Sequence, residues 1–278
     1  MSQSIVSRST LPTPAEAAAA HGWRRVLAFG AHPDDLDFGA AATVAGLTRA
    51  GVEVTYCVMT DGDAGGFDPQ DRHAIDDRRQ QEQRDAAALL GVRDVEFMGE
   101  RDGYLEPSHE VIAQVVALMR RHRPDAVIAM HPERDWSRLQ RSHPDHLAAG
   151  EAVVRAAYPA VENPFAYPEL VEQGLEAFKL RWLVLFGGPA SLTNLVVDVT
   201  GTEQLKLQAL RHHVSQHPDV PRMETFVLDA MAGLHRTWGP GTEDDGARGG
   251  PGSPAGGVRY AEAFHLVAVN DESTISGF

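Results

Sequence analysis

The sequence of 278 residues contains a single cysteine, Cys57, so no disulfide bond can form within the chain. The lack of disulfides is typical of proteins in a reducing compartment. Because Cys57 lies in the apolar run 52–60, we interpret it as a small buried hydrophobic residue. No apolar run approaches the roughly 18 residues that a membrane-spanning helix requires, and the N-terminus lacks the basic-then-apolar order of a signal peptide. We therefore expect a cytoplasmic protein without membrane insertion.

Positive charge is also scarce, because 25 Lys and Arg residues stand against 39 Asp and Glu residues, for a net charge of −14. Such a chain repels the phosphates of nucleic acids and anionic lipids, so neither is an expected partner. No G-x-G-x-x-G motif follows the first apolar run, which argues against dinucleotide binding. The hydrophobic fraction of 43% and the charged fraction of 23% are ordinary for a globular protein.

Apolar runs alternate with helical patterns through the first 160 residues. The runs predict strands at 23–30, 52–60, 94–98 and 126–130. The segments between and after them predict helices at 38–50, 76–90, 111–121 and 145–157. This alternation indicates βαβ units, and therefore an α/β, Rossmann-like fold with a mostly parallel sheet flanked by helices. In such a fold the active site lies at the edge formed by the C-terminal ends of the strands.

The remaining segments are less regular and predict a smaller C-terminal α+β portion. A short helix at 14–21 precedes the core, a proline-rich surface excursion is expected at 163–174, and a mobile Gly/Pro-rich loop at 239–257. Further strands are expected at 182–186, 195–199 and 258–270, with helices at 202–215 and 223–234. No linker divides the chain, so we expect a single domain over residues 1–278 with its core at about 22–216.

The motif Ala31-His-Pro-Asp-Asp35 directly follows the first predicted strand. One imidazole and two carboxylates at the end of a buried strand are costly unless they are paired or bind a metal ion. His32, Asp61, Asp102 and His131 each lie near the C-terminal end of a predicted strand, so these polar residues should meet at one edge of the sheet.

His146 is the best candidate for a further metal ligand, because its predicted helix has a small apolar face that should point at the sheet (Ala149, Gly150, Val153 and Ala157). With His32 and Asp35 it would form a 2-His-1-carboxylate site that leaves positions open for water and substrate. The alternative is that these residues only cap helices and fill the core.

Three neighbouring residues could take part in the chemistry. Asp34, beside a ligand but not bound, could take a proton from an activated water, or could simply cap the following helix. His143 could face the pocket as a cation and stabilise an oxyanion or protonate a leaving amine. Asp145 could hold a histidine in its working tautomer, or favour the positive end of its helix.

The pair AHPDD and His143-Pro-Asp-His146 resembles the LmbE-like (PIG-L) superfamily of zinc-dependent N-acetylglucosamine-type deacetylases. The similarity covers roughly residues 24–216 and the last strand. It continues in the sequences at 61–66, 79–92, 101–103 and 261–264.

The resemblance implies zinc bound by His32, Asp35 and His146. It also implies a general base, Asp34, and an electrophilic or acid partner, His143. Arg79 and Asp102 match positions that hold sugar hydroxyls in the family. The alternative without a substrate is that Arg79 forms a charge pair with Glu82 on a helix surface, and that Asp102 is an ordinary aspartate in a turn. The substrate would be a small N-acetylated sugar, and because relatives often assemble, a homo-oligomer is expected.

Two positions depart from the family pattern. Asp37 replaces the usual glutamate behind the metal ligands, and Arg141 stands where some sugar deacetylases have a tyrosine as oxyanion donor. The oxyanion donor must then be another group or a guanidinium.

Three other functions compete with deacetylation. The first is an amidase acting on a glucosamine-linked thiol conjugate. The second is a non-haem iron oxygenase that uses the same three ligands to bind Fe²⁺. Fe²⁺ is also an alternative to zinc as the metal of the hydrolase. The third is a non-catalytic sugar-binding module, in which Asp34 would have no role.

Overall fold

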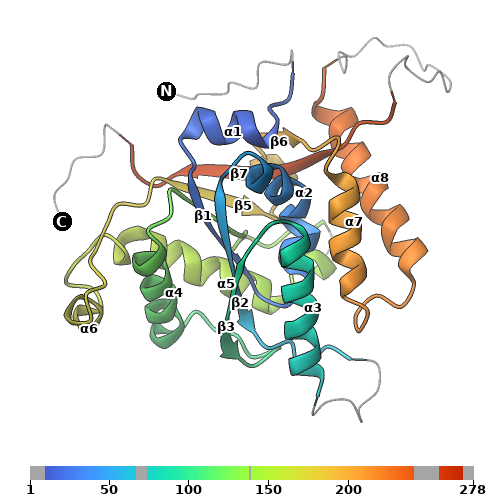
Figure 1. Ribbon diagram of the computed structural model, residues 1–278. Coiled ribbons are helices and arrows are strands. Elements are labelled where there is room, and N and C mark those ends of the chain that lie inside the picture. The colour runs from blue at the N-terminus through green and yellow to red at the C-terminus, as the bar shows by residue number, and fades with distance from the viewer. Residues whose placement is uncertain (1–9, 67–73, 138, 241–256, 272–278) are drawn as a thin grey trace.

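The computed structural model describes residues 10–66, 74–137, 139–240 and 257–271. Their centre is a seven-stranded sheet with the order β3-β2-β1-β4-β5-β7-β6 (Figure 1). The strands are β1 (Arg25–Gly30), β2 (Glu53–Thr60), β3 (Asp94–Glu100), β4 (Ala126–Met130), β5 (Trp182–Phe186), β6 (Leu195–Asp198) and β7 (Ala261–Ala268).

Strands β1 to β5 run parallel to one another, whereas β7 lies between β5 and β6 and is antiparallel to both. The inner parallel strands consist mainly of apolar residues because both faces of a parallel sheet are covered by helices. Every residue of β4 is buried, as are five of the six residues of β1. The expected mostly parallel α/β sheet is confirmed.

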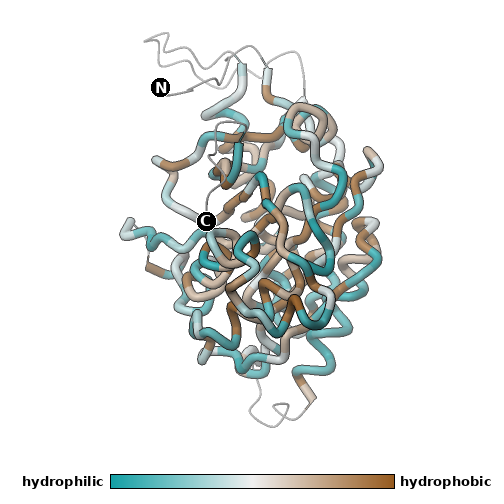
Figure 2. The backbone as a smooth tube through the Cα atoms, turned by 90° about the vertical axis from the view of Figure 1, so that its left-hand side faces the viewer, coloured by the Kyte–Doolittle hydropathy of each residue, from teal (hydrophilic) through white to brown (hydrophobic). Residues whose placement is uncertain are grey.

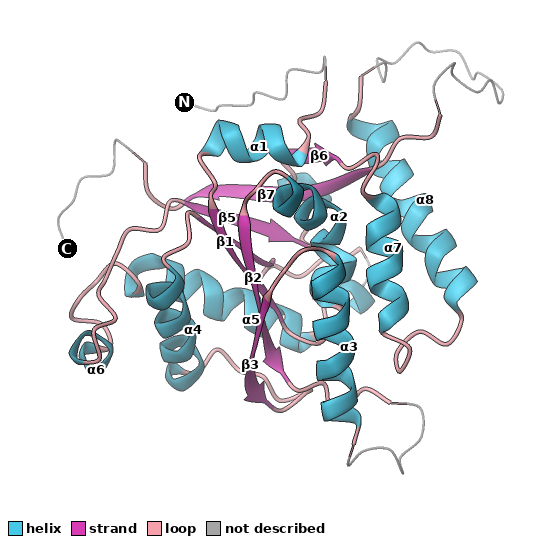
Figure 3. Ribbon diagram, viewed as in Figure 1, coloured by secondary structure: helices cyan, strands magenta, loops and turns pink. Residues whose placement is uncertain are grey.

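Helices cover both faces of the sheet (Figure 3). On one face α7 (Glu203–His212) packs against α2 (Asp35–Arg49) and α3 (Ile75–Leu89). On the other, α4 (His109–His122) packs against α5 (Pro144–Arg155). The remaining α-helices are α1 (Pro14–His21), α6 (Pro168–Glu172) and α8 (Val220–Trp238). Apolar segments lie mainly inside the molecule and hydrophilic ones on its outer helices and loops (Figure 2).

Several element boundaries differ from those expected. Helix α2 begins at Asp35, three residues before the expected start, so the acidic residues Asp35 and Asp37 occupy its first turn, where the helix dipole favours negative charge. Helix α8 extends beyond both ends of the expected 223–234, and α6 lies within the expected surface excursion. The expectation for the loop at 239–257 falls mainly on residues 241–256, outside the described part of the chain. Among the described residues, no helix has the length and apolar character needed to cross a membrane.

Candidate metal centre

The candidate site lies where the strand order reverses. The chain runs from β1 to β2 and β3 on one side and returns to β4 on the other, so the loops after β1 and β4 diverge at the sheet edge. In open α/β sheets such a point forms a ligand-binding crevice. The loop after β1 carries His32, and the segment after β4 leads to His143 and to His146 in the first turn of α5.

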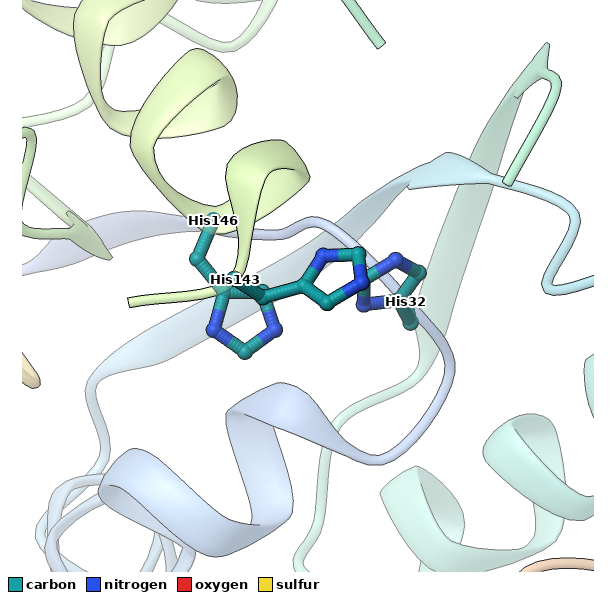
Figure 4. Close-up of side chains that lie close together, drawn as sticks. All are labelled: His32, His143 and His146. Atoms are coloured by element: carbon teal, nitrogen blue, oxygen red, sulfur yellow. The ribbon is translucent and has the colours of Figure 1, made fainter. Parts of the chain in front are cut away.

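The three histidine side chains point toward one another (Figure 4). The ring centroid of His32 lies 5.0 Å from that of His143 and 5.2 Å from that of His146. Nitrogen atoms from all three rings lie within 4.8 Å of one another, a separation that one metal ion could bridge. His143 is the N-cap of α5 rather than part of the helix, and its Nδ1 accepts a hydrogen bond from the backbone N–H of Asp145 at 3.2 Å.

Asp35 joins the two predicted histidine ligands. Its Oδ2 lies 3.3 Å from His32 Nδ1, and its Oδ1 lies 3.1 Å from His146 Nε2. The backbone N–H of His32 donates to Asp35 Oδ2 at 2.7 Å, which fixes the carboxylate at the turn. The structure therefore brings together the three residues that the sequence suggested as ligands.

Two further carboxylates surround His32. Its Nε2 lies 3.2 Å from both Asp102 Oδ1 and Asp145 Oδ2. Asp145 Oδ2 also accepts a hydrogen bond at 2.7 Å from the backbone N–H of Gly103, which ties the loop after β3 to α5. The position of Asp145 suits the predicted role of orienting a histidine.

Ionisable side chains of the cluster have strongly shifted pKa values. Burial alone would lower the pKa of His32, but Asp35, Asp102 and Asp145 together raise it to about 12. Burial would raise the pKa of Asp35, but His146 and His32 hold it well below its usual range. The pKa of His143 is lowered by burial and by the neighbouring His32 and His146, which disfavours the cationic form expected for this residue.

The donor set suits a divalent cation. Three buried carboxylates surround His32, and Asp145 Oδ1 is a buried oxygen without a hydrogen-bond partner among the described residues. Imidazole nitrogen and carboxylate oxygen are the ligands that zinc and iron(II) accept in open sites. A bound cation would replace the proton that His32 otherwise retains.

Asp34 has an unusual backbone conformation for a non-glycine residue, with φ at 108°. Although it occupies the N-cap position of α2, its side chain makes no capping hydrogen bond, so the alternative capping role is wrong. Its backbone N–H donates to Gln83 Oε1 at 2.8 Å, and its Oδ2 lies 3.2 Å from His217 Nε2. Strain of this kind persists only where surrounding contacts enforce it, and it is concentrated at functional sites.

Arg79 is buried at the polar side of the cluster, so the alternative of a helix-surface charge pair is wrong. Its guanidinium donates to the carbonyls of Pro33 at 2.7 Å and Gly62 at 2.9 Å. It also lies 3.5 Å from Asp102 Oδ2 and 3.8 Å from Asp34 Oδ1. Arg79 therefore fixes two active-site loops and supplies positive charge to both carboxylates.

Asp37 lies fully buried behind the cluster. Its Oδ2 accepts a hydrogen bond from Gln83 Nε2 at 2.8 Å and lies 2.7 Å from His213 Nε2. Sequence reasoning missed Gln83, His213 and His217. Gln83 shares the face of α3 that carries Arg79, four residues earlier, which was the available signal. His213 caps the C-terminal end of α7 and His217 follows it. Neither belongs to a motif, so the sequence did not indicate a role for them.

Other predicted residues lie elsewhere. Asp61 accepts from Gln80 Nε2 at 2.9 Å on the α3 side of the site. The ring of His131 contacts His265 rather than a residue of the cluster, with its Nε2 3.0 Å from His265 Nδ1. The side chain of Arg141 lies outside what the structure describes, so its suggested contact with an oxyanion stays a prediction.

Fold and site together define an α/β protein with a candidate metal centre at its topological reversal. Residues 27–157 match the PIG-L family model, described as GlcNAc-PI de-N-acetylase. The chain belongs to this LmbE/PIG-L superfamily, as the motifs indicated.

Three relatives illustrate the similarity. The chain is 30% identical to diacetylchitobiose deacetylase of Thermococcus kodakarensis, over 70% of this chain and 71% of the relative. It is 31% identical to a probable N-acetyl-alpha-D-glucosaminyl L-malate deacetylase 2 of Bacillus cereus, over 69% of this chain and 84% of the relative. The solved N,N'-diacetylchitobiose deacetylase of Pyrococcus horikoshii, complexed with its inhibitor MPG, superposes with a TM-score of 0.76 at 29% identity, covering 89% of this chain and 85% of that one.

Proposed function

We propose that the protein is a metal-dependent N-deacetylase that removes the acetyl group from an N-acetylglucosamine-type sugar or sugar conjugate. The observation that carries the proposal is the convergence of His32, Asp35 and His146 beside the strained Asp34. The named activities of the relatives, which are deacetylations of acetylated glucosamine compounds, support the same reaction.

We assign the metal to His32, Asp35 and His146, with zinc as the first choice. When bound there, the cation would polarise the amide carbonyl and make a water molecule more acidic. Asp145 would hold His32 in place from behind, and Asp37 would hold Gln83 and thereby the backbone of Asp34.

The remaining steps belong to the side chains. Asp34 takes a proton from the attacking water, whose oxygen adds to the carbonyl carbon. His143 donates a hydrogen bond to the oxygen on which negative charge develops. The carbon–nitrogen bond then breaks, the nitrogen takes up the proton that Asp34 removed from water and leaves as a free amine, and the acyl group leaves as acetate. Because its pKa is lowered, His143 acts here as a neutral hydrogen-bond donor.

The sugar would lie on the polar side of the cluster. There Asp102 and Arg79 line the loops after β2 and β3, where they can hold sugar hydroxyls. Arg79 has two of its donors committed to loop carbonyls, and Asp102 has His32 and Arg79 beside its oxygens but keeps further lone pairs that can accept from a sugar hydroxyl. The single domain, the homo-oligomer and the cytoplasmic location stay predictions.

Acetate release from a panel of N-acetylglucosaminides and glucosamine-linked thiol conjugates tests the proposal. Asp34→Asn should retain bound metal and lose roughly 10²–10⁴-fold in kcat, the usual contribution of a general base. His146→Ala should lose both metal and activity. Unchanged hydrolysis in both variants would contradict the mechanism, and a preference for thiol conjugates would identify the amidase alternative.

A further inference from the structure

A cavity of about 400 Å³ adjoins the candidate metal centre on the side opposite Arg79 and Asp102. Asp35 and His146 belong to its wall, so it opens directly onto the proposed reaction centre. Further wall residues come from the ends of β4 and β5, the beginning of β7, and helices α2 and α8. In the sheet, β1, which leads into His32, lies between two groups of strands. Strands β2 and β3 are on the side of Arg79 and Asp102, and strands β4, β5 and β7 are on the side of the cavity.

The lining of the cavity is mainly apolar. Its apolar wall is made chiefly of large side chains, which are Phe38, Met130, Phe186, Phe226, Val227 and Met231. Phe226 is 59% exposed at α8, a large apolar side chain left without a covering segment among the described residues. Gly39 permits the wall to close, because a Cβ atom there would lie 2.3 Å from the Phe186 ring.

Apart from Asp35 and His146, the polar lining residues already have partners. Lys206 Nζ donates to Glu262 Oε1 and to the Phe38 carbonyl, both at 2.6 Å. The Glu262 carboxylate also accepts from the backbone N–H of Thr43 at 2.8 Å. His131 contacts His265 and accepts from the backbone N–H of Glu133 at 3.0 Å. An occupant would therefore be held by apolar contact rather than by charge.

An amide bound at the cluster has two sides, the amine side and the acyl side. With the sugar amine on the polar side, the acyl group points toward the cavity. An acetyl methyl group is about the size of a water molecule, roughly 30 Å³, so it would fill only a small part of this space. We propose, on the basis of the proposed function, that the cavity binds the acyl side of the substrate. The enzyme then hydrolyses N-acyl glucosamine compounds with apolar acyl groups longer than acetyl.

The reaction is the same hydrolysis as for acetyl. The oxygen of water becomes the second oxygen of the released carboxylate, the carbon–nitrogen bond breaks, and the amine leaves with a proton. Only the length of the released carboxylic acid changes.

The test measures the free amine released by the wild-type protein, which is glucosamine from N-acetyl-, N-butanoyl- and N-hexanoylglucosamine, and octyl glucosaminide from an octyl glycoside of N-acetylglucosamine. Full burial of one added methylene should raise kcat/KM by about fourfold, so burial of even two of the four methylenes that hexanoyl adds to acetyl should give a gain of at least about tenfold. Hydrolysis of none of these amides would overturn the proposed function itself. Hydrolysis of the acetyl compound with a falling rate for longer acyl groups would overturn only this inference, as would a gain confined to the octyl glycoside.

A matched pair of variants locates the effect. Ala230 is exposed on α8 and lines the cavity, so Ala230→Trp should lower the hexanoyl-to-acetyl ratio of kcat/KM by about tenfold. Thr225 lies on the opposite face of the same helix, because five residues correspond to a rotation of about 500°. Thr225→Trp should leave the ratio unchanged. An equal ratio in the two variants would place the acyl group outside the cavity.

Discussion

At the scale of single residues, a buried chain of side chains holds the proposed base. His213 contacts Asp37, Asp37 accepts from Gln83, and Gln83 accepts from the backbone N–H of Asp34. The side chains of Asp37 and His213 are both fully buried. Because Asp34 is held through this chain, the geometry of the proposed base depends on His213, which lies far away in sequence.

His213 should make the stability depend on pH. Burial would lower its pKa, but the hydrogen bond with Asp37 and its charge raise it above the ordinary value of about 6.5. When the pKa of a histidine is higher in the folded than in the unfolded state, proton binding stabilises the folded state. The contribution is complete at a pH below the unfolded-state pKa, and it is lost as the pH rises through the folded-state pKa. Urea unfolding from pH 6 upward should therefore show a free energy of unfolding that falls more in the wild type than in His213→Phe.

The neighbouring variant His212→Phe is the control, because His212 is more exposed and should leave the pH dependence as in the wild type. If the difference in free energy of unfolding between wild type and His213→Phe stays constant with pH, the His213 imidazole does not bind a proton on folding.

Residues in compact motifs could be predicted from the sequence, and those that meet through the fold could not. AHPDD and HPDH each place several polar groups within one turn, so His32, Asp35 and His146 were identifiable by type and spacing. His217 reaches Asp34 from 183 positions away, and only the packing of α7 against α2 and α3 brings it there. The hydrogen bonds of Arg79 to two loop carbonyls could not be predicted from its position in the sequence either.

At the scale of elements, α5 approaches β4 very closely at Gly150. A Cβ atom there would lie 2.6 Å from the Met130 carbonyl oxygen and 2.8 Å from the Pro132 nitrogen. Both are backbone atoms, which cannot rotate away. The small face of this helix, expected to point at the sheet, is buried as predicted, and it sets the depth at which His146 reaches the cluster.

Gly150→Ala should therefore destabilise the protein by about 1–3 kcal/mol, the cost of overpacking a core. The same substitution at Gly233 in α8 is the matched control, because its Cβ atom would come no closer than 3.7 Å to a flexible Arg236 side chain. There alanine should be neutral or stabilise by up to about 1 kcal/mol through helix propensity. Thermal or urea unfolding measures both, and equal effects at the two sites would refute the close approach.

In the whole molecule, the sheet brings residues that are far apart in the sequence close together at one edge. The order of alternating strands and helices predicted the parallel sheet and the edge at which the polar residues meet. The antiparallel insertion of β7 between β5 and β6 was not predictable, because it depends on the last strand returning across the whole chain. That return brings Glu262 and Ala263 to the cavity beside the cluster, and so completes a wall that no local pattern indicated.

We propose that a single metal ion at His32, Asp35 and His146 enables this fold to hydrolyse an N-acetylated sugar. The most direct test is to remove metal by chelation and then titrate zinc while acetate release from an N-acetylglucosaminide is measured. Activity should be lost on chelation and return in proportion to zinc, reaching its maximum at one ion per chain in the wild type but not in His146→Ala. Full acetate release after the metal has been removed would show that hydrolysis does not need the ion.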